Sequence, residues 1–102
     1  MNRVTVTDEA VNISIEGMVT IPRNAIAKVY LRTENMKPPG LKVLGTYLPK
    51  AIAAGTYHSP GRREFWNTHF HDECIVFDLS GFDYTCVVID APDAQKLIEI
   101  LS

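Results

Sequence analysis

Hydrophobic and polar positions alternate along the N-terminal part of the chain. Val4 and Val6 are separated by a threonine, and Val11 and Ile13 are separated by an asparagine. Successive side chains of a β-strand point to opposite faces of a sheet, so a period of two indicates a strand with one buried face. We therefore expect two half-buried strands, joined by a hairpin at the short polar segment 8–10.

Similar patterns continue towards the C-terminus, separated by turn residues. We expect further strands at five segments, which are 25–32, 41–48, 63–68, 74–79 and 84–90. Gly45 interrupts one of them and predicts a bulge or a close backbone approach. The segment 18–22 leads to Pro22, which ends any ladder that it enters because it has no N–H. Residues 51–54 are expected to form a helical turn, and Pro60 with Gly61 predicts a tight turn. We expect about seven strands in total.

The spacing of apolar residues changes after this region. They now fall three and four positions apart, as on one face of a helix, at Ala94, Leu97, Ile98 and Leu101. Pro92 suits the first helical turn, because its missing N–H would have no helical partner there. Asp90 and Asp93 place negative charge at the positive end of the helix dipole. The pattern predicts one C-terminal helix at about residues 92–101 in a mainly β protein.

Length, composition and charge narrow the class of protein. The 102 residues are expected to form a single domain, 1–102, with one modest core. Apolar residues at 46% and charged residues at 22% are typical of a globular chain. The formal net charge of −2 argues against a nucleic-acid partner, which requires a basic face. The chain has no transmembrane run and no signal-peptide h-region, so we expect a cytoplasmic protein, although a fragment of a larger membrane protein would give the same pattern.

Three segments carry a resemblance to a known family. They are IPRNAIAKVYLR (21–32), LGTYLPKAIAAGTY (44–57) and IVFDLSGFDYTCVVIDAPDAQKLIEIL (75–101). From about Val11 to Leu101 the chain resembles the bacterial pleckstrin-homology-like (PH-like) families of unassigned function. The resemblance implies an antiparallel barrel or roll that one C-terminal helix caps, with Leu97, Ile98 and Leu101 plugging the core. It also implies a binding or assembly module and not an enzyme.

The resemblance bears on the partner as well. Eukaryotic PH domains hold phosphoinositides with basic residues in the first hairpin loop, and the matching segment here, TDEAVN (7–12), is acidic. This argues against a phosphoinositide ligand. An incompletely closed barrel leaves unpaired backbone groups at its strand edges. We therefore expect a protein partner or a second copy of the chain in a homo-oligomer, and no cofactor; a small-molecule or lipid carrier is an alternative.

The segment NTHFHDE contains the chain's best candidate metal ligands. If it were a continuous strand, His69, His71 and Glu73 would share one face, and two histidines with a carboxylate are a ligand set for zinc or iron. The same face would then continue into Ile75 and Phe77, which look like core residues. The preferred interpretation is a polar turn between two strands. Metal binding, or a metal-dependent enzyme, is the alternative.

Two cysteines, Cys74 and Cys86, allow two further interpretations. A hairpin turn at residues 79–81 would place them directly opposite each other, close to disulfide distance. A reducing cytosol would keep them as thiols, which is the interpretation we prefer. Cys74 would be a nucleophile only with a base such as His69 or His71 beside it, and a small apolar core residue is the simpler explanation.

An arginine pair offers the best candidate for an exposed recognition patch. Arg62 and Arg63 follow a turn, with Lys50 upstream and Trp66 downstream. Arginine beside an aromatic residue is favoured at protein interfaces and can hold anionic groups. A solvated β-turn would explain the same residues. The sequence thus predicts a non-catalytic binding or self-association module, without a specified ligand.

Overall fold

A computed structural model describes residues 3–14, 18–32, 41–48, 52–68, 73–91 and 93–101. These residues form nine strands, one 3-10 turn and one α-helix. In chain order the elements are β1 (Arg3–Val6), β2 (Ala10–Ser14), β3 (Met18–Pro22), η1 (Arg23–Ala25), β4 (Ile26–Leu31), β5 (Leu41–Leu48), β6 (Ile52–Ser59), β7 (Arg62–Thr68), β8 (Cys74–Leu79), β9 (Cys86–Asp90) and α1 (Ala94–Leu101).

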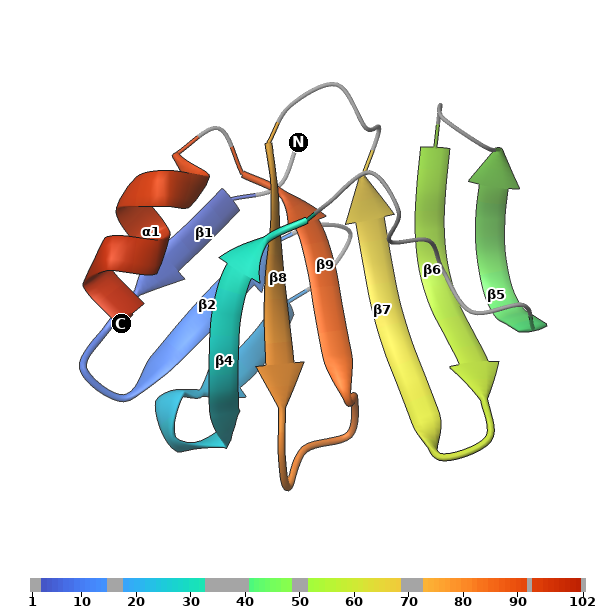
Figure 1. The fold of residues 1–102 in the computed structure, drawn as a ribbon, viewed down its shortest axis with the longest axis horizontal. Helices are drawn as coiled ribbons and strands as arrows, with labels where there is room; N and C mark the ends of the chain where they lie inside the picture. The colour runs from blue at the N-terminus through green and yellow to red at the C-terminus, as the bar shows by residue number, and fades with distance from the viewer. Residues whose placement is uncertain are drawn as a thin grey trace.

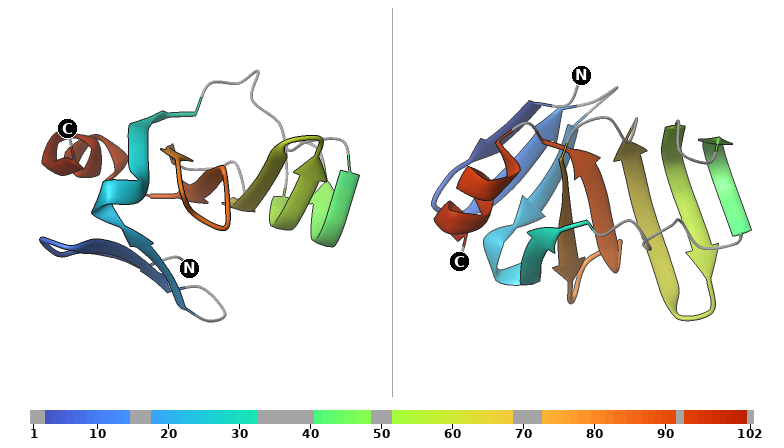
Figure 2. Two further views of the ribbon diagram at one scale, coloured as in Figure 1. Left: turned by 90° about the horizontal axis from the view of Figure 1, so that it is seen from below. Right: turned by 45° about the horizontal axis from the view of Figure 1, so that its top comes forward.

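The strands form two sheets. One has three strands in the order β1-β2-β3, and the other has six in the order β4-β8-β9-β7-β6-β5. The three-stranded sheet and α1 lie against the part of the larger sheet that contains β4, β8 and β9 (Figures 1 and 2). β5 and β6 extend beyond the smaller sheet, so the larger sheet has a covered part and a wing.

The expected fold class is confirmed in its coarse form and corrected in three details. The protein is mainly β with one C-terminal helix, but the described strands form two open sheets and no closed barrel. Nine strands are described where about seven were expected. The pairing is also not wholly antiparallel, because β7 and β9 run parallel. Strand β9 pairs with β8 on one side and with β7 on the other, so the C-terminal hairpin enters the middle of the sheet.

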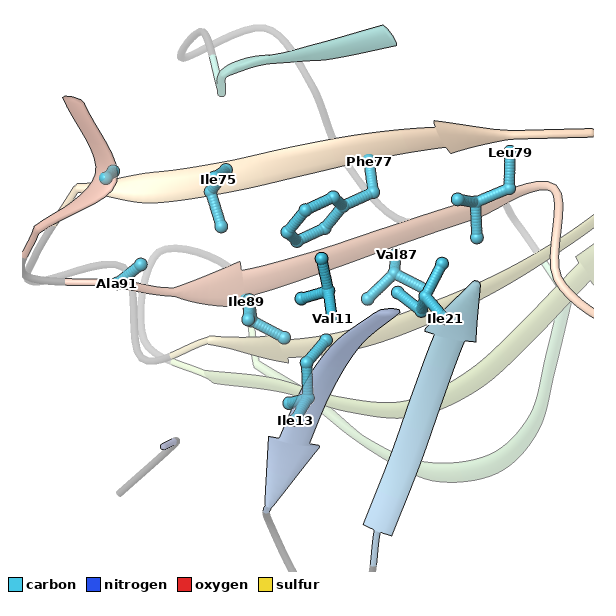
Figure 3. Close-up of a cluster of buried hydrophobic side chains, with 10 residues drawn as sticks. Val11, Ile13, Ile21, Ile75, Phe77, Leu79, Val87, Ile89 and Ala91 are labelled. Atoms are coloured by element: carbon cyan, nitrogen blue, oxygen red, sulfur yellow. The ribbon is translucent and has the colours of Figure 1, made fainter. Parts of the chain in front are cut away.

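A single apolar cluster fills the space between the sheets. The smaller sheet contributes Val11, Ile13 and Ile21, each with no exposed surface. Alternate residues of β8 and β9 meet them from the larger sheet, and these are Ile75, Phe77, Leu79, Val87 and Ile89 (Figure 3). The period-two pattern of the sequence therefore has the predicted result in β2 and β3, whose inward-facing residues are the apolar ones. β8 and β9 are instead buried on both faces, since Val76 and Val88 on the opposite side also have no exposed surface.

The C-terminal helix lies at one side of this cluster. Ala94 is fully buried, and Leu97, Ile98 and Leu101 pack against the cluster with part of their surface exposed. The predicted apolar stripe is therefore confirmed. The observed helix, Ala94–Leu101, begins two residues later than expected.

A bulge changes the predicted faces of β4. Strict alternation would place Ile26 on the same face as Lys28 and Tyr30. The pairing of β4 with β8 shifts between Ile26 and Lys28, and Ile26 instead packs on the core with Val29 and Leu31. An extra residue in one strand moves all later side chains to the other face, which accounts for the difference.

The segment around β5 and β6 differs from expectation in two places. Residues 52–54 belong to β6, so the helical turn predicted at 51–54 is wrong over these residues. The β5–β6 register shifts between Lys42 and Leu44, and Gly45 lies directly opposite Gly55. The turn at Pro60 and Gly61 is confirmed, and Gly61 has a φ of 73°, which an L-residue rarely adopts.

Candidate functional site

The second face of the six-stranded sheet, opposite the main core, has a mixed polar and apolar surface. Strand register arranges it in three rows that cross β7, β9 and β8. We call it the polar face and define it by its members, which are Tyr30, Tyr57, Glu64, Trp66, Thr68, Cys74, Val76, Asp78, Cys86, Val88 and Asp90. The two outer rows each combine a cysteine with at least one acid, and the middle row is apolar with Trp66 at one end.

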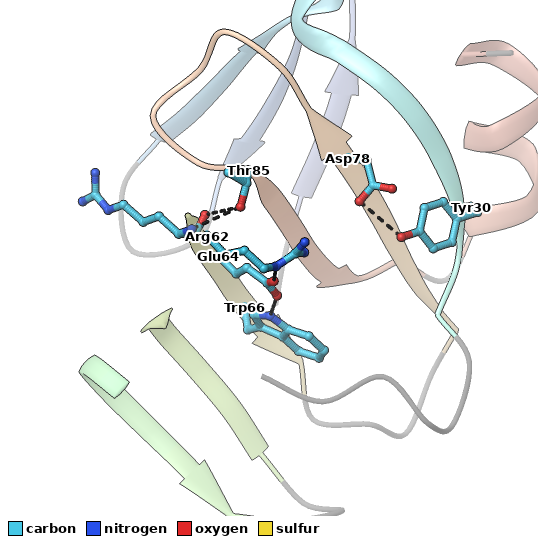
Figure 4. Close-up of polar contacts among 7 residues, drawn as sticks. Tyr30, Arg62, Glu64, Trp66, Asp78 and Thr85 are labelled. Atoms are coloured by element: carbon cyan, nitrogen blue, oxygen red, sulfur yellow. Dashed lines mark hydrogen bonds and ion pairs between the residues drawn. The ribbon is translucent and has the colours of Figure 1, made fainter. Parts of the chain in front are cut away.

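Glu64 is the most buried charged group of the polar face. Only 5% of it is exposed, and it accepts two hydrogen bonds. The indole Nε1 of Trp66 donates to Oε1 at 2.9 Å, and Arg62 Nε donates to Oε2 at 2.6 Å (Figure 4). The hydrogen bond to Glu64 raises the pKa of Arg62. Both partners are needed here, because a buried carboxylate without them would carry a large desolvation penalty.

A second polar group lies at the other end of the same three strands. The Thr68 hydroxyl donates to the Asp90 carboxylate and lies 3.1 Å from Cys74 Sγ. Cys74 Sγ also lies 3.5 Å from the same Asp90 oxygen. Burial raises the pKa of the Cys74 thiol, and the hydrogen bond with Thr68 acts in the opposite direction. A protonated thiol is a poor nucleophile, so this environment favours a structural role for Cys74.

Tyr30 and Cys86 are two further titratable groups of this face. The Tyr30 hydroxyl donates to Asp78 Oδ1 at 3.2 Å (Figure 4). Burial, and then Asp78, raises the pKa of Tyr30 to about 12. Burial raises the pKa of Cys86 to about 12, with further contributions from the carboxylates of Glu64 and Asp78. Both groups remain protonated at neutral pH.

The predicted recognition patch is divided between the two faces of β7. The sequence predicted that Trp66 belongs to an exposed patch. Only 1% of Trp66 is exposed, so this part of the prediction is wrong. Trp66 lies with Arg62 on the polar face, where Glu64 links them. Arg63 lies on the other face, with its guanidinium 4.9 Å from the Tyr84 ring centre. Lys50 lies outside the described residues, and the binding role of the arginines stays a prediction.

The predicted metal site is described only in part. Glu73 is exposed, whereas His69 and His71 lie outside the described residues. Among the residues that the structure does describe, no three His, Cys, Asp or Glu side chains are arranged to hold a metal ion. The metal reading therefore stays a hypothesis about the segment that precedes β8.

The predicted opposition of the two cysteines is wrong. Cys74 lies opposite Asp90, and Cys86 lies opposite Asp78. The hairpin loop is longer than the 79–81 turn assumed, since Leu79 N donates to Thr85 O at 2.9 Å and the loop spans residues 80–85. Neither cysteine is in a disulfide and both thiols are buried, in agreement with the interpretation preferred from the sequence.

Strand edges offer a different kind of site. β1 and β3 are the edges of the smaller sheet, and β4 and β5 are the edges of the larger one. β1 has four residues, and β3 ends at Pro22. β4 carries Lys28 next to a bulge and has α1 packed beside it. Short length, proline, lysine and bulges all discourage pairing with another chain, so three edges are protected.

The edge strand β5 lacks these protections over its second half. It has eight residues, and Leu44–Leu48 pairs with β6 in unbroken register after the shift at Lys42. This five-residue stretch, LGTYL, contains no charge and no proline. No described strand pairs with its outer side. We call residues 44–48 the open edge. In a strand, every second residue directs its N–H and C=O away from the neighbouring strand, so the open edge presents backbone donors and acceptors that no described strand pairs with.

Comparison of the chain with protein-family models, with curated proteins and with solved structures finds no match. The description of the site therefore depends on its geometry alone. In the part of the chain that is described, no helix has the length and hydropathy needed to cross a membrane.

Proposed function

We propose that this protein is a non-catalytic binding module that captures an extended polypeptide segment at the open edge of β5. The observation that carries the proposal is the unbroken, uncharged pairing of residues 44–48 with β6 at the outside of a six-stranded sheet. An added strand would pair with this backbone and extend the sheet by one strand. Main-chain hydrogen bonds would supply affinity, and alternate side chains would supply specificity.

The distribution of packing in the molecule supports this assignment. The main core lies under β4, β8 and β9, and the smaller sheet does not extend over β5 (Figures 1 and 2). The open edge thus lies on the wing of a sheet whose centre is held by buried side chains. Sites presented on a rigid element lose less entropy when a ligand binds.

A PH-like identity is part of the proposal and is supported by one feature. The last strand leads into a single helix, and Leu97, Ile98 and Leu101 pack on the core, as that resemblance implies. We also propose that the protein acts in the cytoplasm on a protein segment. The protonated state of Cys74 and Cys86 at neutral pH favours binding over nucleophilic chemistry.

Adjacent proline substitutions in β5 test the proposal. Outward and inward N–H groups alternate, so of Thr46→Pro and Tyr47→Pro, one removes an outward N–H and the other removes a hydrogen bond to β6. The variant that loses only an outward N–H should fold, and the variant that loses a hydrogen bond to β6 should be destabilised. The probe is a set of octapeptides selected from a random library on the immobilised wild-type chain. We expect the folded proline variant to bind these peptides at least about tenfold more weakly, which corresponds to about 1.4 kcal/mol.

Amide hydrogen exchange gives a second measurement that needs no variant. Peptide binding should slow exchange at alternate residues of 44–48 and leave the amides of β1 unchanged. Selected peptides that bind the folded proline variant as well as the wild type, and protect no β5 amide, would show that the open edge is not the binding site.

A further inference from the structure

We propose that the segment captured by the open edge is β5 of a second copy of this chain, paired antiparallel about a twofold axis at Thr46. This inference rests on the proposed function, because it uses the same backbone groups of residues 44–48. The resulting dimer would join two six-stranded sheets edge to edge into one continuous sheet.

The symmetry of an antiparallel ladder restricts how two β5 strands can meet. Opposed residues alternate between hydrogen-bonded and non-hydrogen-bonded pairs. If residue 45 of one copy faced residue 46 of the other, the twofold axis would also make residue 46 face residue 45. These two neighbouring pairs would be equivalent, so both would be hydrogen-bonded or both would not, which the alternation forbids. One residue of β5 must therefore face the same residue of the second copy. The possible dimers are those centred on a single residue of β5.

A centre at Thr46 uses the whole open edge. Leu44 then faces Leu48 of the second copy, Gly45 faces Tyr47, and Thr46 faces Thr46. All five uncharged residues are opposed to one another, whereas a centre at Gly45 brings Lys42 into the ladder opposite Leu48. Threonine pairs and apolar pairs are favoured across antiparallel strands.

The charge on β5 favours this orientation over the parallel one. Lys42 is the only charged residue of the strand. In-register parallel pairing would set Lys42 against Lys42 at the spacing of adjacent strands, about 5 Å. In the antiparallel dimer centred at Thr46, the two copies of Lys42 are eight positions apart along the ladder. At ~3.3 Å per residue they are roughly 26 Å apart, well beyond a physiological screening length of about 8 Å.

The arrangement of the elements leaves this edge accessible. In the views of Figures 1 and 2, β5 is the outermost strand of the wing, and β1, β2, β3 and α1 lie at the opposite end of the sheet. A second copy that approaches β5 along the direction of the sheet would meet none of these elements. The twofold also closes the assembly, because each copy uses its open edge once.

A charge-reversal pair tests the twofold centre. Thr46→Lys and Thr46→Glu each place two like charges opposite each other in the dimer, so each variant alone should dimerise at least about tenfold more weakly than the wild type. An equal mixture should form the Lys–Glu heterodimer, and its affinity should fall as salt is added. Thr5→Lys, on an exposed site of β1, is the matched control and should dimerise like the wild type. Sedimentation velocity over a range of concentrations measures all of these states.

Cysteine crosslinking tests the register. Opposed Cα atoms in an antiparallel ladder are about 4.5–5.5 Å apart, within disulfide range. Thr46→Cys should crosslink to itself under mild oxidation, and Leu44→Cys should crosslink to Leu48→Cys in a mixture but not to itself. The native thiols are buried and serve as an internal control. Crosslinking of Leu44→Cys to itself would show parallel pairing or an antiparallel dimer centred at Leu44, and either result would overturn the inference.

The outcomes separate this inference from the proposed function. A wild-type chain that stays monomeric at all concentrations, while selected octapeptides still bind in a β5-dependent manner, overturns the dimer and retains the binding module. A dimer that is unaffected by Thr46→Lys forms through another surface and also overturns the inference. A monomer that binds no octapeptide overturns both.

Discussion

Cys86 illustrates at the scale of one residue how the polar face affects stability. The thiol has an ordinary pKa near 9, and burial, with the carboxylates of Glu64 and Asp78, raises the pKa to about 12 in the folded protein. Between these values the unfolded chain loses the thiol proton and the folded chain keeps it. The folded state then binds more protons, so stability must fall as pH rises through this window.

We therefore predict that the free energy of unfolding decreases from about pH 9 towards pH 12, in part because of Cys86. This group alone contributes a slope of up to about 1.4 kcal/mol per pH unit. Cys86→Ala should have a shallower dependence on alkaline pH in urea unfolding. Val88→Ala is the control, since it removes a buried, non-titrating side chain from the same strand and face. An identical slope for Cys86→Ala and the wild type would contradict the prediction.

The sequence predicted the strand that carries part of this face, and missed the burial of its centre. The period-two spacing of Glu64, Trp66 and Thr68 places them on one side of a strand, which the sequence shows. Their burial could not be predicted, because it depends on β9 lying beside β7 in a parallel pair. The neighbours Arg62 and Arg63 were treated as one patch, although adjacent strand residues point to opposite faces. Applying the alternation to this pair would have separated them.

At the scale of elements, the helix was the most predictable part of the chain. Its 3.6-residue period is distinct from the period of the strands, and the stripe of Leu97, Ile98 and Leu101 does pack on the core. An eight-residue helix is too short to be stable alone, so this packing must hold it in place.

We predict that Leu97→Ala destabilises the protein by about 1–2 kcal/mol, below the range for fully buried leucines because Leu97 is only half-buried. Ile100 is the matched control on the same helix, since it is 50% exposed and Ile100→Ala should change stability by no more than about 0.5 kcal/mol. Chemical denaturation followed by far-UV circular dichroism measures both. Equal effects of the two substitutions would show that the apolar stripe does not anchor α1.

Strand partners were less predictable than strands. The hairpin of β8 and β9 was expected because only a short turn separates two apolar segments, and it is confirmed. The position of that hairpin between β4 and β7 brings together segments far apart in the chain, and nothing in the spacing of apolar residues specifies it. The open edge of β5 follows from this order. Its composition is visible in the sequence, but its place at the outside of the sheet is not.

At the scale of the whole molecule, the two sheets share one core. Val11, Ile13 and Ile21 pack against residues of β8 and β9 (Figure 3). A single sheet cannot cover its own apolar face, so the three-stranded sheet depends on the larger one to bury Val11, Ile13 and Ile21. The sheets should therefore unfold together as a single cooperative unit.

Trp66, the only tryptophan, lies on the far face of the larger sheet and so reports on cooperativity from a distance. We predict that Ile13→Ala, on β2, lowers the stability measured by Trp66 fluorescence by about 2–4 kcal/mol, because it opens a cavity in the shared core. Far-UV circular dichroism, which reports on both sheets, should give the same denaturation midpoint. The control Thr5→Ala removes an exposed side chain of β1 and should shift neither signal by more than about 0.5 kcal/mol. If Ile13→Ala melted the smaller sheet and left the Trp66 transition in place, the two sheets would be independent units, and the single cooperative transition that we predict would be wrong.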